Sequence, residues 1–379
     1  MTRSSPYTPG EVARAVPGRS AQIRWYTERA EEIGVLRRFH GRVRVDHAPR
    51  GVGKTSLLRE GERIATQNGC ATVWVTANED EGLLPTIVSE LRALLPAAKR
   101  KSVELTEAVD SITMSLGMGP AKASVTLKSG AIAAASAGKA FSKVLKSVSK
   151  SLDKGIVILI DEVQSADRSS LRALANAWQE LLDDPGKPAA GLFMAGLPGS
   201  VDHIISAATS AERFDFQPLL GIDDDGSTEA LLRPAQALKV TWEEEALARA
   251  VAESNGYPHK VQLMGQASWV AAADPEEGAQ ISLAHVEAAI PSVERQMRVL
   301  FTARWRSAST RQRELMVAMA ELGGADVKRE HLANQLGVDT KVISVPRDKL
   351  LQKGLIDANR HGYVSFTLPG FTEYVLEQA

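Results

Sequence analysis

The sequence predicts an α/β protein with a parallel sheet covered by helices on both faces, followed by an all-helical segment and a C-terminal winged helix-turn-helix. Three observations support this prediction. Short apolar or β-branched runs alternate with helical patterns up to about residue 220, as strands and crossover helices do in a parallel sheet. Strand patterns then disappear between about Gly221 and Leu300, and short helices followed by a hairpin end the chain.

Composition excludes several classes of protein. The chain has 379 residues, 44% of them hydrophobic, and a formal net charge of 45 − 46 = −1, which argues against disorder, collagen-like sequence and a simple coiled coil. Cys70 is the only cysteine, so an intramolecular disulfide and cysteine-based zinc sites are excluded. Residues 1–18 lack the apolar run of a secretory signal, and no run is long enough to span a bilayer. We therefore expect a cytoplasmic protein without a membrane partner.

The expected strands and helices of the first part follow from these runs. Its helix over about Thr55–Gln67 ends at Asn68-Gly69, where glycine can adopt the left-handed stop position. The five expected strands are Val43–His47, Ala71–Thr76, Ile156–Ile160, Gly191–Ala195 and Phe214–Gln217.

Residues 97–155 separate the second and third strands by more than one crossover helix needs, which indicates an insertion. Its charge is 10 − 4 = +6. Alternating apolar residues over Ser111–Gly119, and again at Val125 and Leu127, predict a β-hairpin. Five lysines recur at spacings of three and four, on one face of a helix expected over Ala131–Leu152 and just beyond it; they are Lys139, Lys143, Lys146, Lys150 and Lys154. Such a face is either solvated or able to bind phosphate backbones.

The later elements are expected to be helical, with prolines marking starts or breaks. Between residues 221 and 300 the expected helices are Glu229–Leu238, Trp242–Ser254, His259–Ala273 and Leu283–Leu300. After residue 310 they are Arg311–Leu322, Arg329–Leu336 and Thr340–Lys353. Short strands at Gly354-Leu-Ile and Tyr363–Leu368, joined by Asn359-Arg-His-Gly, complete the winged helix-turn-helix.

The strongest motif is Ala48-Pro-Arg-Gly-Val-Gly-Lys-Thr55, which lies between a predicted strand and a predicted helix. Its glycines allow backbone N–H groups to surround phosphate oxygens, and the helix N-terminus adds a positive dipole. Lys54 is expected to reach the β- and γ-phosphates of a nucleotide, and Thr55 to ligate Mg²⁺. The candidate nucleotide-binding residues are Pro49, Arg50, Gly51, Val52, Gly53, Lys54, Thr55 and Ser56.

A second motif, Ile156-Val-Ile-Leu-Ile-Asp-Glu162, is an apolar strand that ends in two carboxylates. Ligands of open parallel sheets bind at the carboxyl ends of the strands. Asp161 is therefore the second candidate for holding Mg²⁺, and Glu162 for polarising the water that attacks the γ-phosphate. The alternative is that both residues simply cap the next helix.

Together these motifs resemble the AAA+ ATPases, in particular the branch with origin-recognition initiators and STAND-like ATPases. The phrases Asp161-Glu-Val-Gln164 and Ala195-Gly-Leu-Pro-Gly199 share in the resemblance. So does Val16-Pro-Gly-Arg19, followed by Ile23, which is similar to the box that packs on adenine and makes Arg19 a candidate cofactor-binding residue. The implied domains are an N-terminal segment 1–40, an ATPase core 41–220, a helical lid 221–300 and a winged helix 301–379.

The resemblance also implies three nucleotide-sensing positions. A polar first sensor is expected near Ala195-Gly196, where no Ser, Thr or Asn stands. His259 occupies the second-sensor position in Gly256-Tyr-Pro-His259-Lys260, unless this is a plain helix start. Arg213 matches the arginine finger that reaches a neighbouring subunit, which implies a homo-oligomer, unless it is an ordinary surface arginine.

These motifs predict an Mg²⁺-dependent ATP hydrolase that acts as a nucleotide-controlled switch. Its expected partner is duplex DNA, bound by the lysine face and by a recognition helix that carries Lys341, Arg347, Lys349 and Lys353. The alternative is a STAND-like signalling or defence ATPase that acts on a separate protein effector. A third hypothesis, suggested by the absent first sensor, is nucleotide binding without turnover.

Overall fold

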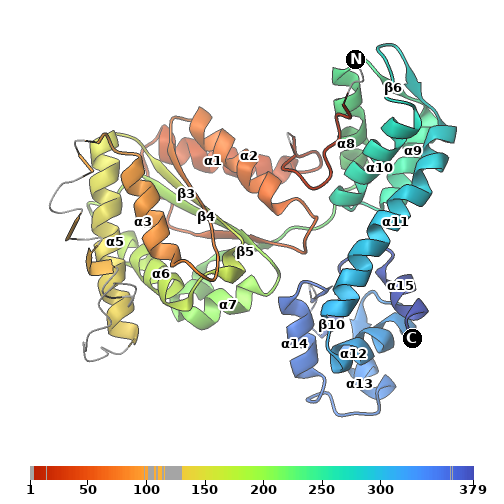
Figure 1. The fold of residues 1–379 in the computed structure, drawn as a ribbon. Coiled ribbons are helices and arrows are strands. Elements are labelled where there is room, and N and C mark those ends of the chain that lie inside the picture. The colour runs from red at the N-terminus through yellow and green to blue at the C-terminus, as the bar shows by residue number, and fades with distance from the viewer. Residues whose placement is uncertain are drawn as a thin grey trace. The chain divides into compact units, whose positions relative to one another are not determined.

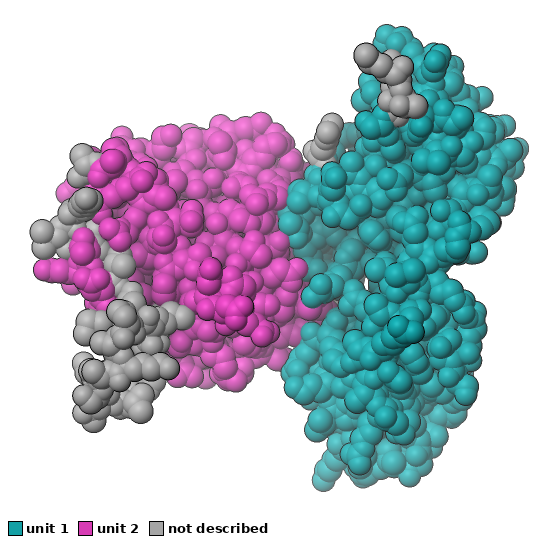
Figure 2. Space-filling model, in the orientation of Figure 1, with its two compact units in different colours: residues 1–20, 48–56, 218–379 teal, residues 21–47, 57–217 magenta. Residues whose placement is uncertain are grey.

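The computed structural model describes residues 4–13, 15–97, 99–100, 106–107, 110–112, 115, 130–358, 360 and 362–379. The chain divides into two compact units, which Figure 2 distinguishes by colour. Unit 1 comprises residues 1–20, 48–56 and 218–379, and unit 2 comprises residues 21–47 and 57–217.

Unit 2 contains the predicted parallel sheet, with strand order β2-β3-β4-β1-β5. The strands are β1 (Arg44–His47), β2 (Ala71–Thr76), β3 (Ile156–Asp161), β4 (Ala190–Gly196) and β5 (Asp215–Pro218). Pairings of β1 with β4, β2 with β3 and β3 with β4 are all parallel. Every residue of β3 and β4 is buried, which explains their continuous apolar runs. The predicted fold class and all five predicted strands are confirmed.

Helices cover both faces of this sheet (Figure 1). On one face are α1 (Ser20–Gly34) and α2 (Lys54–Gln67). The other face carries α3 (Leu83–Ala93), α5 (Gly130–Leu152), α6 (Arg168–Leu182) and α7 (Ser200–Ala207). Short 3-10 turns, η1 (Val163–Ser165) and η2 (Thr209–Arg213), follow β3 and precede β5.

The insertion contains the predicted helix as α5. Its buried face includes Phe141, Val144, Leu145 and Val148, which join the core of unit 2. Ser111, Ile112 and Ser115 are helical, so the predicted hairpin is wrong at these positions. The rest of that hairpin, including Val125 and Leu127, lies outside the described residues.

Unit 1 includes the predicted helical segment. Its helices are α8 (Asp224–Ala237), α9 (Glu244–Ser254), α10 (Pro258–Ala271) and α11 (Leu283–Ser307). Two short strands, β6 (Thr241–Trp242) and β7 (Gln280–Ile281), pair in parallel where the sequence predicted no strand. A two-residue strand is too short to leave a periodic signal.

The C-terminal part of unit 1 contains the three predicted helices as α12 (Thr310–Glu321), α13 (Arg329–Gln335) and α14 (Ser344–Gln352). Strands β9 (Ile356–Asp357) and β10 (Tyr363–Phe366) pair antiparallel as the predicted hairpin. The sequence interpretation missed β8 (Val327–Lys328), which pairs with β10, and the last helix, α15 (Phe371–Glu377). Within the described residues no helix is both long and apolar enough to cross a membrane.

Candidate functional site

The candidate phosphate loop directly follows β1 and ends where α2 begins at Lys54. Gly51 and Gly53 have φ angles of +83° and +93°, in the left-handed region that favours glycine. Ala48, which replaces the first glycine of the usual motif, is not among the residues with positive φ. Its side chain therefore causes no backbone strain at this position.

The side chain of Lys54 is buried against this loop. Its Nζ donates a hydrogen bond to the carbonyl oxygen of Pro49 over 2.9 Å. Thr55 is half-buried at the second position of α2, and the Ser56 hydroxyl accepts a hydrogen bond from the Ala13 N–H over 3.0 Å. The lysine is thus held within the loop that would surround the phosphates.

Arg19 links the candidate loop to the start of the helical segment. It is only 5% exposed and donates to the carbonyl oxygens of Val52 (3.1 Å) and Leu220 (2.6 Å). A guanidinium keeps its charge even when buried. The structure therefore places this predicted cofactor-binding residue beside the phosphate loop, where its guanidinium binds backbone carbonyl oxygens.

Two residues at the start of α10 contact the same loop. The hydroxyl of Tyr257 donates to the Arg50 carbonyl over 2.9 Å, and the His259 N–H donates to the Gly51 carbonyl over 3.1 Å. Burial raises the pKa of Tyr257 to about 12, so its hydroxyl stays protonated as a donor. Burial lowers the pKa of His259, so its ring is neutral at physiological pH. Tyr257 was missed, although it lies within the phrase that predicted His259.

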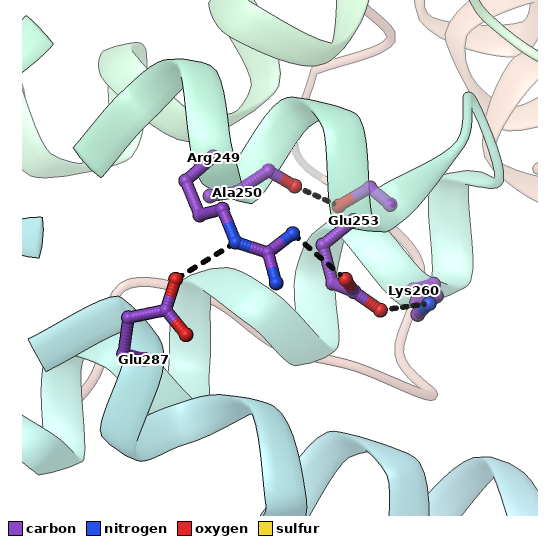
Figure 3. Close-up of polar contacts among 6 residues, drawn as sticks. Arg249, Ala250, Glu253, Lys260 and Glu287 are labelled. Carbon is purple, nitrogen blue, oxygen red and sulfur yellow. Dashed lines mark hydrogen bonds and ion pairs between the residues drawn. The ribbon is translucent and has the colours of Figure 1, made fainter. Parts of the chain in front are cut away.

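Lys260, the residue after His259, belongs to an ion-pair network with residues of α9 and α11 (Figure 3). It binds Glu253 over 2.8 Å, and Glu253 also accepts from Arg249 over 3.0 Å. Arg249 in turn pairs with Glu287 over 2.8 Å. Burial alone would raise the pKa of Glu253, but the hydrogen bonds and charges of Lys260 and Arg249 outweigh it and leave that pKa lowered. Of the two residues, His259 is the one whose backbone contacts the phosphate loop.

In unit 2, Asp161 ends β3 as predicted. It is buried, and its carboxylate accepts the N–H of Glu162 over 2.9 Å. Because His47 of β1 pairs with Gly196 of β4, and Ile160 of β3 with Met194, the carboxyl ends of β1 and β3 lie at the same edge of the sheet. This is the edge at which open parallel sheets bind ligands.

Glu162 has an unusual backbone and a side-chain partner that the sequence interpretation missed. Its φ of +52° is in the left-handed region, which non-glycine residues rarely adopt. The side-chain amide of Gln164 donates to its carboxylate. Left-handed non-glycine residues concentrate at functional sites, where surrounding contacts maintain the strain.

Arg213 ends η2 with an exposed side chain that donates to the Gln179 side-chain oxygen over 3.2 Å. An exposed arginine fits the predicted finger and an ordinary surface residue equally well. Its role remains a prediction.

The predicted DNA-binding side chains fall into two groups. Lys139, Lys143, Lys150 and Lys154 are exposed, whereas Lys146 pairs with Asp184. On α14, Lys349 is exposed and Arg347 pairs with Asp348 over 3.0 Å, and Lys341 is exposed in the turn before this helix. Lys353 instead donates to the Ser307 carbonyl (2.5 Å) and the Gln312 side chain (2.8 Å), so it binds its own chain.

Comparisons with known proteins agree with this geometry. Residues 26–185 match the family described as AAA ATPase domain, and residues 298–375 match a domain of unknown function (DUF8462). Among curated proteins none is significantly similar to this chain. The predicted resemblance to AAA+ ATPases is confirmed by the match over residues 26–185.

Two solved structures share the fold over nearly the whole chain. The Aeropyrum pernix ORC2 protein, solved as ADPNP–ADP complexes, has a TM-score of 0.59 at 14% identity and covers 98% of this chain and 95% of its own. The Walker-type ATPase PABY2304 of Pyrococcus abyssi has a TM-score of 0.60 at 15% identity and covers 100% and 99%. At these sequence identities the similarity shows a shared fold and nothing about function.

Proposed function

We propose that this protein binds ATP with Mg²⁺ and hydrolyses it, and that the nucleotide state switches its action on a partner. The observation that carries the proposal is the phosphate loop, with left-handed Gly51 and Gly53 and the buried Lys54. The nucleotide complexes of the Aeropyrum pernix ORC2 protein, which has the same fold, support this role.

The residues present fit an Mg²⁺–triphosphate. The backbone conformation of Gly51 and Gly53 frees N–H groups for phosphate oxygens, and Lys54 would exchange the Pro49 carbonyl for the β- and γ-phosphates. Thr55 and Asp161 have the hard oxygen donors that Mg²⁺ prefers. When bound, Mg²⁺ neutralises charge that develops on the phosphate oxygens.

In the proposed reaction the carboxylate of Glu162 accepts a hydrogen bond from a water molecule and orients the water oxygen toward the γ-phosphorus. A new P–O bond forms, the bond to the β–γ bridging oxygen breaks, and the water proton leaves through the carboxylate to the products. Arg213 of another copy would stabilise charge on the transferring group, and His259 would contact phosphate as a neutral donor.

A glutamine substitution tests the catalytic assignment. Glu162→Gln should keep ATP affinity within about threefold and lower turnover by several orders of magnitude, because only the carboxylate is removed. Lys54→Ala should abolish binding itself. Steady-state phosphate release beside nucleotide titration distinguishes the two effects. Wild-type turnover in Glu162→Gln would refute the assignment.

For the partner, we propose duplex DNA bound partly by the four exposed lysines of α5 and its C-terminal end. Each DNA phosphate that a lysine no longer neutralises should flatten the slope of log K against log salt by about 0.9. Replacing both Lys143 and Lys150 with Ala should thus flatten the slope by about two. The control Lys239→Ala, at an exposed lysine that is ion-paired with Glu277, should leave the slope unchanged. DNA affinity weaker than about 0.1 mM near physiological salt in every nucleotide state would exclude this partner.

One observation favours a protein partner as the second candidate. Val338 and Val342, which precede α14, and Val345, in its first turn, are 38%, 55% and 69% exposed. Exposed apolar side chains that gather on a protein surface are typical of protein contacts. Replacing all three with Ser should then abolish effector binding and spare DNA binding, which affinity measurements with each partner would show.

A further inference from the structure

The end of β4 has no space for the polar side chain expected there. A Cβ on Gly196 would lie 2.2 Å from the Ser200 hydroxyl and 2.9 Å from Oε1 of Gln164. A real Cβ essentially never approaches other atoms so closely. The space that a side chain at Gly196 would need, where the sequence offered no first sensor, is thus filled by the side chains of Ser200, Val163 and Gln164.

Of these three side chains, Gln164 is the one that also contacts Glu162, and its orientation is fixed by hydrogen-bond chemistry. Its Oε1 accepts the N–H of Leu197 over 2.9 Å and the hydroxyl of Ser200 over 3.4 Å. A backbone N–H can only donate, so the amide oxygen must face Leu197. The amide nitrogen then faces the carboxylate of Glu162 and donates to it.

The backbone around Glu162 makes this contact possible. With φ at +52° and ψ at 39°, Glu162 turns the chain out of β3 into η1. The turn is closed by the Ser165 N–H, which donates to the Glu162 carbonyl over 2.9 Å. Gln164, two residues after Glu162, is thereby brought back against its carboxylate.

We infer that Gln164 is a positioning residue that ties the carboxylate of Glu162 to the end of β4, in place of a polar residue on β4 itself. The amide holds one carboxylate oxygen and leaves the other to accept from water. Its own oxygen is anchored to the backbone of Leu197, which follows a fully buried strand. This inference rests on the proposed function, because it concerns the residue assigned to water activation.

The test must separate positioning from simple packing. Gln164→Glu keeps the size of the side chain and an oxygen for Leu197 and Ser200, but replaces the donor to Glu162 with a like charge. We expect kcat for Mg²⁺-ATP to fall about 10- to 100-fold, as misplacement of a reacting group does, with ATP affinity within threefold of wild type. Ser200→Ala is the matched control: it removes only the longer bond to the Gln164 oxygen, so kcat should stay within threefold.

The outcomes distinguish this inference from the proposed function. Unchanged kcat in Gln164→Glu, with an active wild type, would overturn the role of Gln164 and leave the proposed function intact. Equal losses in Gln164→Glu and Ser200→Ala would indicate packing and also overturn it. A wild-type protein that binds ATP without hydrolysing it would overturn the proposed hydrolysis, and the role of Gln164 with it.

Discussion

The contact between the phosphate loop and Tyr257 predicts that two neighbouring glycines respond differently to alanine. Both Gly51 and Gly53 have a positive φ, which costs a residue with a Cβ about 1–2 kcal/mol. A Cβ on Gly53 has no atom within 4 Å, whereas one on Gly51 would lie 2.0 Å from the Tyr257 hydroxyl oxygen and 2.6 Å from Cζ. Gly53→Ala should therefore show the backbone cost alone.

Gly51→Ala should cost more, because the tyrosine ring must move. The move breaks the 2.9 Å hydrogen bond from Tyr257 to the Arg50 carbonyl, worth about 1 kcal/mol. We expect a total loss of about 2–3 kcal/mol in the free energy of unfolding, against about 1–2 kcal/mol for Gly53→Ala. Urea unfolding followed by tryptophan emission, with the slope checked for change, would measure both.

A double-mutant cycle isolates the contact. Tyr257→Leu removes the hydroxyl and Cζ, so combining it with Gly51→Ala should recover about 1 kcal/mol relative to the sum of the single changes. The same combination with Gly53→Ala should be additive within about 0.5 kcal/mol. Equal destabilisation by the two alanines, or no coupling between Gly51 and Tyr257, would refute the contact.

Three further predictions concern the lid and the proposed finger. Burial lowers the pKa of His259 in the folded state, so the neutral ring stabilises the fold fully above the unfolded-state pKa of about 6.5, and this stabilisation is lost as pH falls below that value. Between pH 7.5 and 5.5 the melting temperature of His259→Gln should therefore fall less than that of wild type. An equal fall in the two proteins would contradict this. Lys260→Met should leave ATP affinity within twofold, because the lysine is committed to Glu253; a tenfold loss in a nucleotide titration would make Lys260 the sensor. Arg213→Ala should reduce specific ATPase activity only at protein concentrations where the specific activity of wild type rises with self-association. Mixing the Arg213→Ala protein with the Glu162→Gln protein should restore part of the lost activity. A specific activity of wild type that stays constant over a hundredfold dilution would argue against a finger in trans.

Most of the fold could be predicted because buried parallel strands leave a strong signal. The run Ile156–Ile160 is continuously apolar since both faces of β3 are covered. Strands of two residues, such as β6 and β8, leave no period to detect.

The candidate site could be predicted only where its residues are close in sequence. The phosphate loop and the Asp161–Glu162 pair are local motifs whose spacing carries their chemistry. The bond from Tyr257 to Arg50 joins residues 207 positions apart, and nothing in either local pattern specifies it. Gln164 is near in sequence, but its contact with Glu162 depends on a left-handed φ that the residue type does not suggest.

A charge pattern along a helix does not specify which side chains bind within the chain. Lys353 belongs to the predicted DNA-binding set, yet its amine donates to the Ser307 carbonyl and the Gln312 side chain. A lysine has a long flexible stem, so its position on a helix does not determine where its charge lies.

The contacts within unit 1 suggest how the nucleotide state could reach the C-terminal part of the chain. Tyr257 and His259, at the start of α10, contact the phosphate loop, and α10 packs on α11. Helix α11 has 25 residues, about 37 Å at 1.5 Å per residue.

The far end of α11 is bound firmly to the C-terminal part. The Phe301 ring packs 5.5 Å from that of Phe371 and 5.6 Å from that of Tyr374, all three buried. Arg298 adds an ion pair to Glu377 over 2.6 Å. Buried aromatic contacts of this kind do not deform gradually. A change at the phosphate loop that rotates α10 and α11 would therefore carry the C-terminal part with it, which is the coupling that the proposed switch requires.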